Sequence, residues 1–149
     1  MKLTRYTDYA LRVLMHLAAE PDRLSSIAVM ARRYSVSRNH LMKVVHDLRK
    51  AGYLSAVRGR SGGVRLARPP AEIKVGEVIR HTEEGLALVD CASCMLAPAC
   101  GLTGILADAL RAFLAVLDSY TLADLTDGRA EAMRALWAMS PGEPSAAAA

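Results

Sequence analysis

Two short helical patterns followed at once by a glycine-rich hairpin pattern constrain the fold more than any other feature of the sequence. A serine pair can cap a helix over about 26–33, and Ser37 can cap a second helix over about 37–51. Gly52 then ends the second helix, as glycine commonly does just past a helix C-terminus. Two helices joined by so short a turn form a helix-turn-helix motif.

Two β-type runs, 53–57 and 63–67, flank a basic tip rich in glycine and predict a β-hairpin. A hairpin after a helix-turn-helix makes a winged helix, whose wing reaches DNA phosphates or the minor groove. A nucleotide-binding loop is the rival interpretation, but the Lys-Ser or Lys-Thr pair and the following helix that it needs are missing. The wing residues expected at DNA are Arg58, Gly59, Arg60, Gly62 and Gly63.

The second helix of a helix-turn-helix enters the major groove, where its first residues meet base edges. Arginine can pair with guanine, and asparagine with adenine, through two hydrogen bonds each. Polar residues that open a helix can also serve as caps or solvated surface, but the basic context favours DNA contact. The residues expected to make it are Ser37, Arg38, Asn39, His40 and Lys43.

The net charge of +4 conceals an uneven distribution along the chain. Residues 1–80 hold 16 Lys and Arg against six Asp and Glu, a balance of +10, and residues 81–149 hold three against nine, a balance of −6. A basic half of this kind suggests a polyanionic partner, with nucleic acid first, although a solvated charged surface is the common alternative.

The rest of the chain predicts a mainly helical protein, with further helices over 4–19, 72–84, 102–120 and about 128–139. Apolar residues cover so wide a face of 102–120 that something should bury it. A symmetric homodimer is the economical answer, and burial within one subunit is the alternative. No run is long enough to span a membrane and the start lacks the apolar core of a signal peptide, so we expect a cytoplasmic protein without a membrane partner.

All three cysteines lie within ten residues of one another, in the spacing Cys-x2-Cys-x5-Cys. An odd, clustered set in a reducing compartment favours metal or redox chemistry over a disulfide framework. An iron–sulfur cluster, a zinc ion and bare redox thiols are the three alternatives, in that order of preference. The expected sulfur ligands are Cys91, Cys94 and Cys100, and a fourth ligand would come from a distant part of the chain.

Several short stretches together carry a family resemblance. They are Leu3-Thr4 with Thr7-Asp8-Tyr9, Val36 to His40, Ala51-Gly52-Tyr53, Ala56 to Gly59, Gly62-Gly63, Pro98-Ala99-Cys100, and Tyr120 to Leu125. Through them the chain, from its start to about Leu125, resembles the winged-helix iron–sulfur cluster transcriptional repressors. Among these it is most similar to the nitric-oxide-sensitive branch.

The resemblance implies a dimeric repressor that binds a two-fold operator on double-stranded DNA. Each subunit would hold an iron–sulfur cluster, 4Fe–4S in preference to 2Fe–2S, with Asp8 of the partner subunit as the fourth ligand. Arg12 would orient that carboxylate, whereas the plainer role of Asp8 is an ion pair with Arg12. Nitric oxide would then derepress detoxification genes. Another branch of these repressors has a histidine at the position of Thr103, which argues against that branch here. Relatives usually have more than the two residues that separate Cys91 from Cys94 in this chain.

Other functions remain as alternatives on this sequence. One is a repressor on the same scaffold that responds to iron supply or redox state, and another is a zinc-stapled DNA-binding protein without a cluster. An enzyme is not expected, because the four histidines are scattered over predicted helices and no nucleophile accompanies a base.

The predicted fold class is therefore mainly α with a small β-hairpin wing, a winged helix-turn-helix DNA-binding domain plus a long dimerisation helix. The predicted divisions are the DNA-binding domain at 1–80, the cluster-binding loop region at 81–101, the dimerisation and C-terminal helices at 102–139, and a disordered tail at 140–149.

Overall fold

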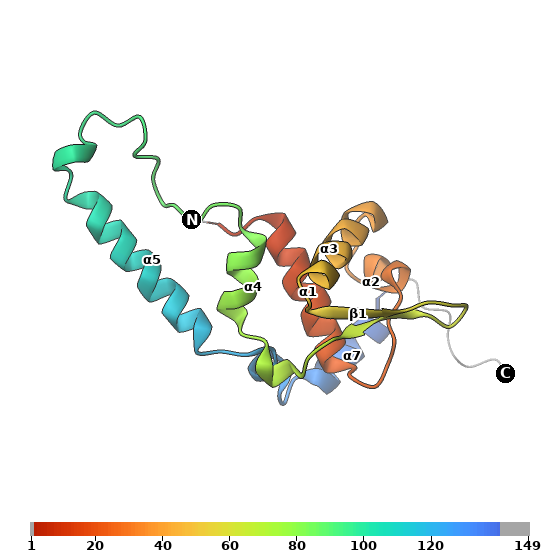
Figure 1. Ribbon diagram of the computed structural model, residues 1–149. Helices are drawn as coiled ribbons and strands as arrows, with labels where there is room; N and C mark the ends of the chain where they lie inside the picture. Colours follow the sequence, from red (N-terminus) through yellow and green to blue (C-terminus); the bar gives the residue numbers. More distant parts are fainter. Residues whose placement is uncertain (1, 141–149) are drawn as a thin grey trace.

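A group of helices carries a two-stranded hairpin on one side and a long helix on the other (Figure 1). The computed structural model describes residues 2–140, so the predicted disordered tail lies outside the described residues apart from Ser140. The mainly helical architecture with one small hairpin confirms the predicted fold class. Its elements are α1 (Arg5–Ala19), α2 (Ile27–Arg33), α3 (Arg38–Lys50), β1 (Leu54–Val57), β2 (Gly63–Leu66), η1 (Pro70–Glu72), α4 (Val75–Thr82), η2 (Ala97–Ala99), α5 (Leu102–Asp118), α6 (Leu122–Thr126) and α7 (Ala130–Ala138).

Helix α1 is the centre of the core because a full face of it is apolar. Ala10, Val13, Leu14 and Leu17 recur at helical spacing and are at most 1% exposed. This face packs against α3, α4 and α6. Thr4 caps the helix, since its hydroxyl accepts a hydrogen bond from the backbone N–H of Thr7. The position of α1 therefore determines how α3 is held.

The helix-turn-helix is formed by α2 and α3, which pack against each other. Ser26 caps α2 by accepting a hydrogen bond from the backbone N–H of Val29 at 3.2 Å. Helix α3 buries Leu41, Val44, Val45 and Leu48, so its other side faces outward. Ser37 occupies the predicted N-cap position of α3 but makes no capping hydrogen bond. Its hydroxyl is therefore not committed to the helix end.

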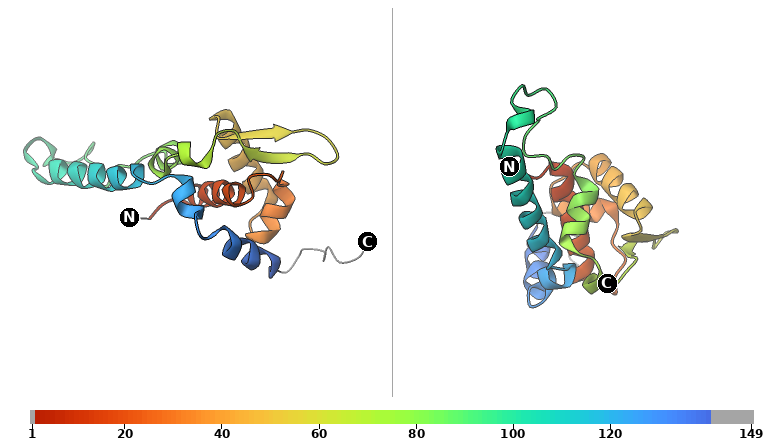
Figure 2. Two further views of the ribbon diagram at one scale, coloured as in Figure 1. Left: turned by 90° about the horizontal axis from the view of Figure 1, so that it is seen from below. Right: turned by 60° about the vertical axis from the view of Figure 1, so that its left-hand side comes forward.

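The wing is an antiparallel hairpin in which Leu54 pairs with Leu66 and Val57 with Gly63. It is anchored to the segment before α2, because Val64 and Ser25 exchange two backbone hydrogen bonds of 2.9 and 3.1 Å. A Cβ at Gly63 would lie 2.9 Å from the Ser25 carbonyl oxygen, so only glycine permits this approach. Beyond the anchor the hairpin extends past the body (Figure 2).

Helix α5 projects from the body, and the segment before it leads outward from α4 to the far end of α5 (Figures 1 and 2). We call residues 84–118 the arm. Its base is closed by backbone hydrogen bonds of 2.9 Å, from the Val75 N–H to the Tyr120 carbonyl and from the Leu122 N–H to the Ile73 carbonyl. Among the described residues, no helix is both long enough and apolar enough to cross a membrane.

The chain returns to the body after the arm. The guanidinium of Arg134, on α7, donates to the carbonyl of Ala19 at 2.7 Å. Trp137 is almost fully buried, and its ring centroid lies 4.5 Å from that of the buried His16 on α1. Helix α7 therefore packs on the body, although the sequence grouped it with the long helix.

Candidate DNA interface and metal centre

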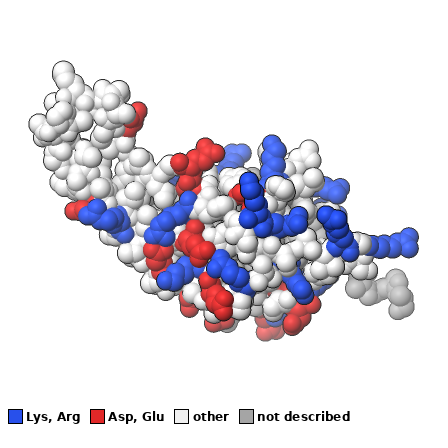
Figure 3. All heavy atoms as spheres, viewed as in Figure 1, with Lys and Arg blue, Asp and Glu red and all other residues white. Residues whose placement is uncertain are grey.

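The predicted reading residues of α3 lie together on its exposed side, opposite the apolar residues that pack on α1. Lysine and arginine side chains are prominent over α3 and the wing in Figure 3, whereas the arm is largely uncharged. The side of α3 that the sequence predicts to contact DNA is thus exposed in the structure. The exposed residues are Ser37, Arg38, Asn39, His40 and Lys43.

Several cations elsewhere on the protein are paired with neighbouring carboxylates. Ion pairs join Arg12 to Asp8, Arg68 to Glu77 and Arg80 to Asp118. Within residues 2–140, by contrast, no carboxylate forms an ion pair with the cations of α3 or of the wing tip. Those cations are Arg38, Lys43, Arg49, Lys50, Arg58 and Arg60. Their charge is therefore available to a polyanion.

The wing tip is a tight turn that holds two arginines away from the body. The Gly62 N–H donates to the Gly59 carbonyl at 3.0 Å, and Gly59 has a φ of +123°. A Cβ at Gly62 would lie 2.3 Å from the Val57 carbonyl oxygen, so the turn itself requires glycine there. Gly62 and Gly63 thus have structural roles, and their contact with DNA stays a prediction. Arg58 and Arg60 are exposed at this tip.

Arg58→Ala is expected to weaken binding to all duplex sequences by a similar factor, because the exposed guanidinium can contact phosphates rather than bases. The slope of log affinity against log salt concentration should fall by about 0.9, the value for one phosphate contact. Fluorescence anisotropy at several salt concentrations measures this slope. A slope equal to that of the wild type would remove Arg58 from phosphate contact.

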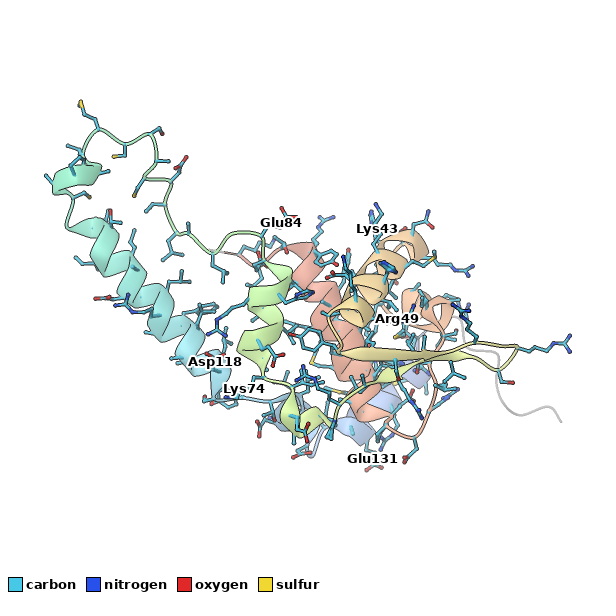
Figure 4. The ribbon with its side chains drawn as sticks, in the orientation of Figure 1. Lys43, Arg49, Lys74, Glu84, Asp118 and Glu131 are labelled. Atoms are coloured by element: carbon cyan, nitrogen blue, oxygen red, sulfur yellow. The ribbon has the colours of Figure 1, made fainter. Side chains whose placement is uncertain are left out.

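The three cysteines lie on the arm, in the segment that leads into α5 (Figure 4). Backbone turns shape this segment, since Cys94 N–H donates to the Cys91 carbonyl at 3.3 Å and Ala97 N–H donates to the Cys94 carbonyl at 3.1 Å. All three are free thiols, with Cys94 exposed and the other two partly so. The loop therefore presents its sulfur atoms outward.

The beginning of α5 favours the thiolate form of Cys100. Backbone N–H groups of Leu102 and then Thr103 donate hydrogen bonds to the sulfur, and the Thr103 hydroxyl contributes a weaker one. These bonds outweigh desolvation and lower the pKa of the Cys100 thiol below its ordinary value. The Thr103 hydroxyl also lies 3.5 Å from the sulfur of Cys91. This environment suits sulfur that must ligate a metal as thiolate.

The residues fit a metal centre in their chemistry but do not complete one within a single chain. Three thiolates are the ligands that iron–sulfur clusters and zinc prefer. Across the described part of one chain, however, no three His, Cys, Asp or Glu side chains are gathered closely enough to hold a metal ion. The loop must therefore close around a group, or receive a ligand from elsewhere, before it forms a site.

Asp8 lies on α1 with its carboxylate held by a two-pronged ion pair. Arg12 Nε is 3.0 Å from Asp8 Oδ1, and Arg12 Nη2 is 2.9 Å from Asp8 Oδ2. The side chain of Asp8 is 46% exposed, so the carboxylate remains accessible from outside the chain. The structure shows the ion pair, and the role of Asp8 as a ligand stays a prediction.

Sequence patterns missed the residues that connect the arm to the DNA-binding helices. Glu83, just after α4, accepts hydrogen bonds from the Thr4 N–H at 2.8 Å, the Thr4 hydroxyl at 3.0 Å and the Thr7 hydroxyl at 2.5 Å. Burial opposes ionisation of Glu83, but the bonds from Thr7 and Thr4 prevail and lower its pKa. No local pattern could reveal partners 76 to 79 positions away.

A second connection joins α4 to the recognition helix α3. His81 Nε2 lies 2.9 Å from Asp47 Oδ2, and the Tyr6 hydroxyl donates to the same oxygen at 2.9 Å. Burial, followed by the hydrogen bond to Asp47, raises the pKa of Tyr6 to about 12, so the phenol stays a donor. The last turn of α4 thus contacts both α1 and α3 directly before the arm begins.

A winged helix-turn-helix with unneutralised cations on its reading side and a thiol-bearing arm defines a DNA-binding transcriptional regulator. The comparison with protein families agrees with this class. The chain belongs to the Rrf2 family, described as iron-dependent transcriptional regulators, whose model matches residues 3–128.

Named relatives narrow the assignment within this family. The chain is 50% identical over 142 residues to the HTH-type transcriptional regulator NsrR of Bacillus subtilis strain 168, covering 91% of this chain and 97% of the relative. It is 51% identical over 136 residues to NsrR of Geobacillus kaustophilus, covering 87% and 92% respectively. These matches confirm the predicted resemblance, and the relatives are regulators rather than enzymes.

Solved structures support the same conclusion. The structure of IscR from T. potens superposes with a TM-score of 0.72 at 31% identity, covering 89% of this chain and 90% of the other. CymR of B. subtilis, the global cysteine regulator of that bacterium, superposes with a TM-score of 0.68 at 29% identity, covering 86% and 98%. The fold is therefore shared with these two regulators.

Proposed function

We propose that the protein is a homodimeric transcriptional repressor that releases a two-fold operator when nitric oxide reaches an iron–sulfur cluster on its arm. The observation that carries this proposal is the arm itself, which presents three thiols and begins at a helix hydrogen-bonded to both α1 and α3. Half of the residues match NsrR regulators, which supports this branch over other members of the family. Its place of action is the cytoplasm, where the DNA lies.

The exposed side of α5 supports the homodimer. Apolar residues form an outer stripe at helical spacing, and none of the residues of α5 is buried in the single chain. Leu102, Ile105 and Val116 are 54%, 66% and 60% exposed. A second copy of the same stripe would cover it across a two-fold axis, which also provides two reading helices for two half-sites. The stripe consists of Leu102, Ile105, Ala109, Ala112 and Val116.

Cys91, Cys94 and Cys100 of one subunit and Asp8 of the partner subunit would hold the cluster, with 4Fe–4S preferred to 2Fe–2S. When bound, the cluster supplies iron atoms that nitric oxide can attack. The carboxylate of Asp8 is a harder ligand than thiolate and is therefore the weakest of the four. Arg12 forms an ion pair with this carboxylate, so the carboxylate keeps a charged partner when it leaves the cluster.

The contacts of α4 suggest how such a release would reach the DNA. Asp8 lies one residue beyond Thr7, whose hydroxyl donates to Glu83. A shift of the first turn of α1 would therefore disturb the bonds that hold α4 and, through Asp47, the recognition helix. The spacing of the two recognition helices in the dimer would change, and genes for nitric oxide detoxification would be transcribed.

Anaerobic purification followed by an absorption spectrum tests the proposal. We expect a coloured protein whose visible absorption changes with nitric oxide. Affinity for its operator should then fall at least 10-fold, equivalent to about 1.4 kcal/mol. A colourless, zinc-loaded protein would overturn the cluster. If an iron chelator or a mild oxidant, but not nitric oxide, released the DNA, the protein would instead be an iron or redox sensor.

A further inference from the structure

Two hollows flank Tyr6, and their linings differ in charge. Asp47, Glu83 and Glu84 line the first, which faces α4. The second lies between the first turns of α1 and the recognition helix. Its lining contains no carboxylate and consists of Arg5, Tyr6, Tyr9, His40, Lys43 and Val44. Tyr6 therefore separates an acidic hollow from a basic one.

Among the described residues, the cations of the basic hollow are in no ion pair, and the nearby Asp8 on α1 is engaged by Arg12. In the part of the chain that the structure describes, neither Arg5 nor Lys43 forms an ion pair or a side-chain hydrogen bond, and both are exposed. The nearest carboxylate on α3, Asp47, is engaged by the Tyr6 hydroxyl and His81, each at 2.9 Å. It lines the acidic hollow instead. The basic hollow is thus complementary to an anion.

The size of the basic hollow favours a single anionic group over a whole small molecule. Its volume of about 240 Å³ falls below the range of roughly 300–1,000 Å³ typical of small-molecule sites. It is bordered by Lys43, which projects from α3 (Figure 4). When a recognition helix lies in the major groove, the flanks of that helix face the phosphate backbone. DNA is therefore the source of anions that this position would meet first.

We propose that the hollow between α1 and α3 receives one phosphate of the DNA backbone, gripped jointly by Arg5 and Lys43. The inference rests on the proposed binding of duplex DNA and adds Arg5, a residue outside the helix-turn-helix and the wing. Because Arg5 belongs to α1 and Lys43 to α3, the phosphate bridges the two helices. The register of the reading helix on DNA then depends on where the first turn of α1 lies, which is the turn that contains Asp8.

The salt dependence of binding to a duplex of arbitrary sequence tests whether Arg5 and Lys43 contact the same phosphate. The double variant Arg5→Gln, Lys43→Gln should lower the salt slope by about 0.9, the value for one phosphate, and lower affinity roughly 5-fold at about 0.15 M salt. Arg5→Gln should lower the slope further when added to Lys43→Gln alone, and Arg5→Lys should behave as the wild type.

Arg129→Gln is the matched control, since Arg129 is an exposed arginine between α6 and α7. Its slope should equal that of the wild type. If Arg5→Gln changed nothing in the Lys43→Gln background, the hollow would not hold a phosphate. A fall of about 1.8 in the double variant would mean two separate phosphates and would also overturn the shared grip. Absence of salt-dependent duplex binding by the wild type would instead overturn the DNA-binding function itself.

Discussion

Ile105→Glu is expected to convert the proposed dimer into monomers and to lower affinity for a two-fold operator by roughly 10²- to 10⁴-fold, the gain that linking two binding modules provides. Ile105 is 66% exposed near the start of the outer stripe of α5. A glutamate there would have to be buried without a partner whenever two stripes meet, and that cost is large. Analytical ultracentrifugation measures the dimer, and binding to an operator selected from random sequences measures the affinity.

Ala107→Glu provides the matched control for this experiment. Ala107 is also exposed on α5 but lies on the opposite side of the helix from Ile105, because two residues are separated by about 200°. The control variant should remain dimeric and keep the affinity of the wild type. Binding of the Ile105→Glu monomer to a single half-site should also be unchanged, which shows that its winged helix is folded. A dimeric Ile105→Glu protein would mean that α5 is not the interface.

Asp8→Ala is expected to shorten the lifetime of the cluster in the presence of an iron chelator by roughly 10- to 100-fold or more, since loss of even an orienting partner has an effect of that size. Only three protein ligands would remain, and all three lie on the exposed arm. Decay of the visible absorption under anaerobic conditions measures this lifetime. Asp22→Ala, which removes an exposed carboxylate beyond the end of α1, should behave as the wild type.

A mixed dimer determines which subunit supplies Asp8. When an Asp8→Ala chain is paired with a Cys100→Ser chain, a ligand donated across the dimer leaves one complete site and one that lacks two ligands. A ligand donated within each chain leaves both sites incomplete. We therefore expect the mixed dimer to retain one stable cluster, about half of the wild-type iron. Retention of all clusters by the Asp8→Ala homodimer would show that Asp8 is not a ligand.

The DNA-binding half of the fold could be predicted because its signals are local. Serine caps, helical spacing and the glycines of the wing place α2, α3 and the hairpin within a residue or two of their observed ends. The predicted helix over 72–84 was too long, since Pro70–Glu72 forms a separate 3-10 turn before α4. Helix α6 was not predicted, because five residues show little periodicity, although Thr121 and Asp124 form a capping box.

The candidate site was predicted only in part. The cysteines were evident from their spacing, and Asp8 came from family resemblance rather than from any pattern around it. Arg5, Glu83 and His81 could not be found, because their significance depends on neighbours from other elements. A sequence pattern reports which side of a helix is apolar, but not which distant side chain meets a given polar residue.

The closed base of the arm has a consequence for how the family can diversify. The backbone bonds between Ile73 and Leu122 and between Val75 and Tyr120 pin the two ends of the arm together on the body. Helix α4 lies between these bonds and contacts α1 and α3, but the arm beyond it, residues 84–118, can change in length without moving the exposed residues of α3 and the wing. A change in the signal that the regulator senses can thus arise from substitutions within the arm while the DNA-binding residues of α3 and the wing stay the same.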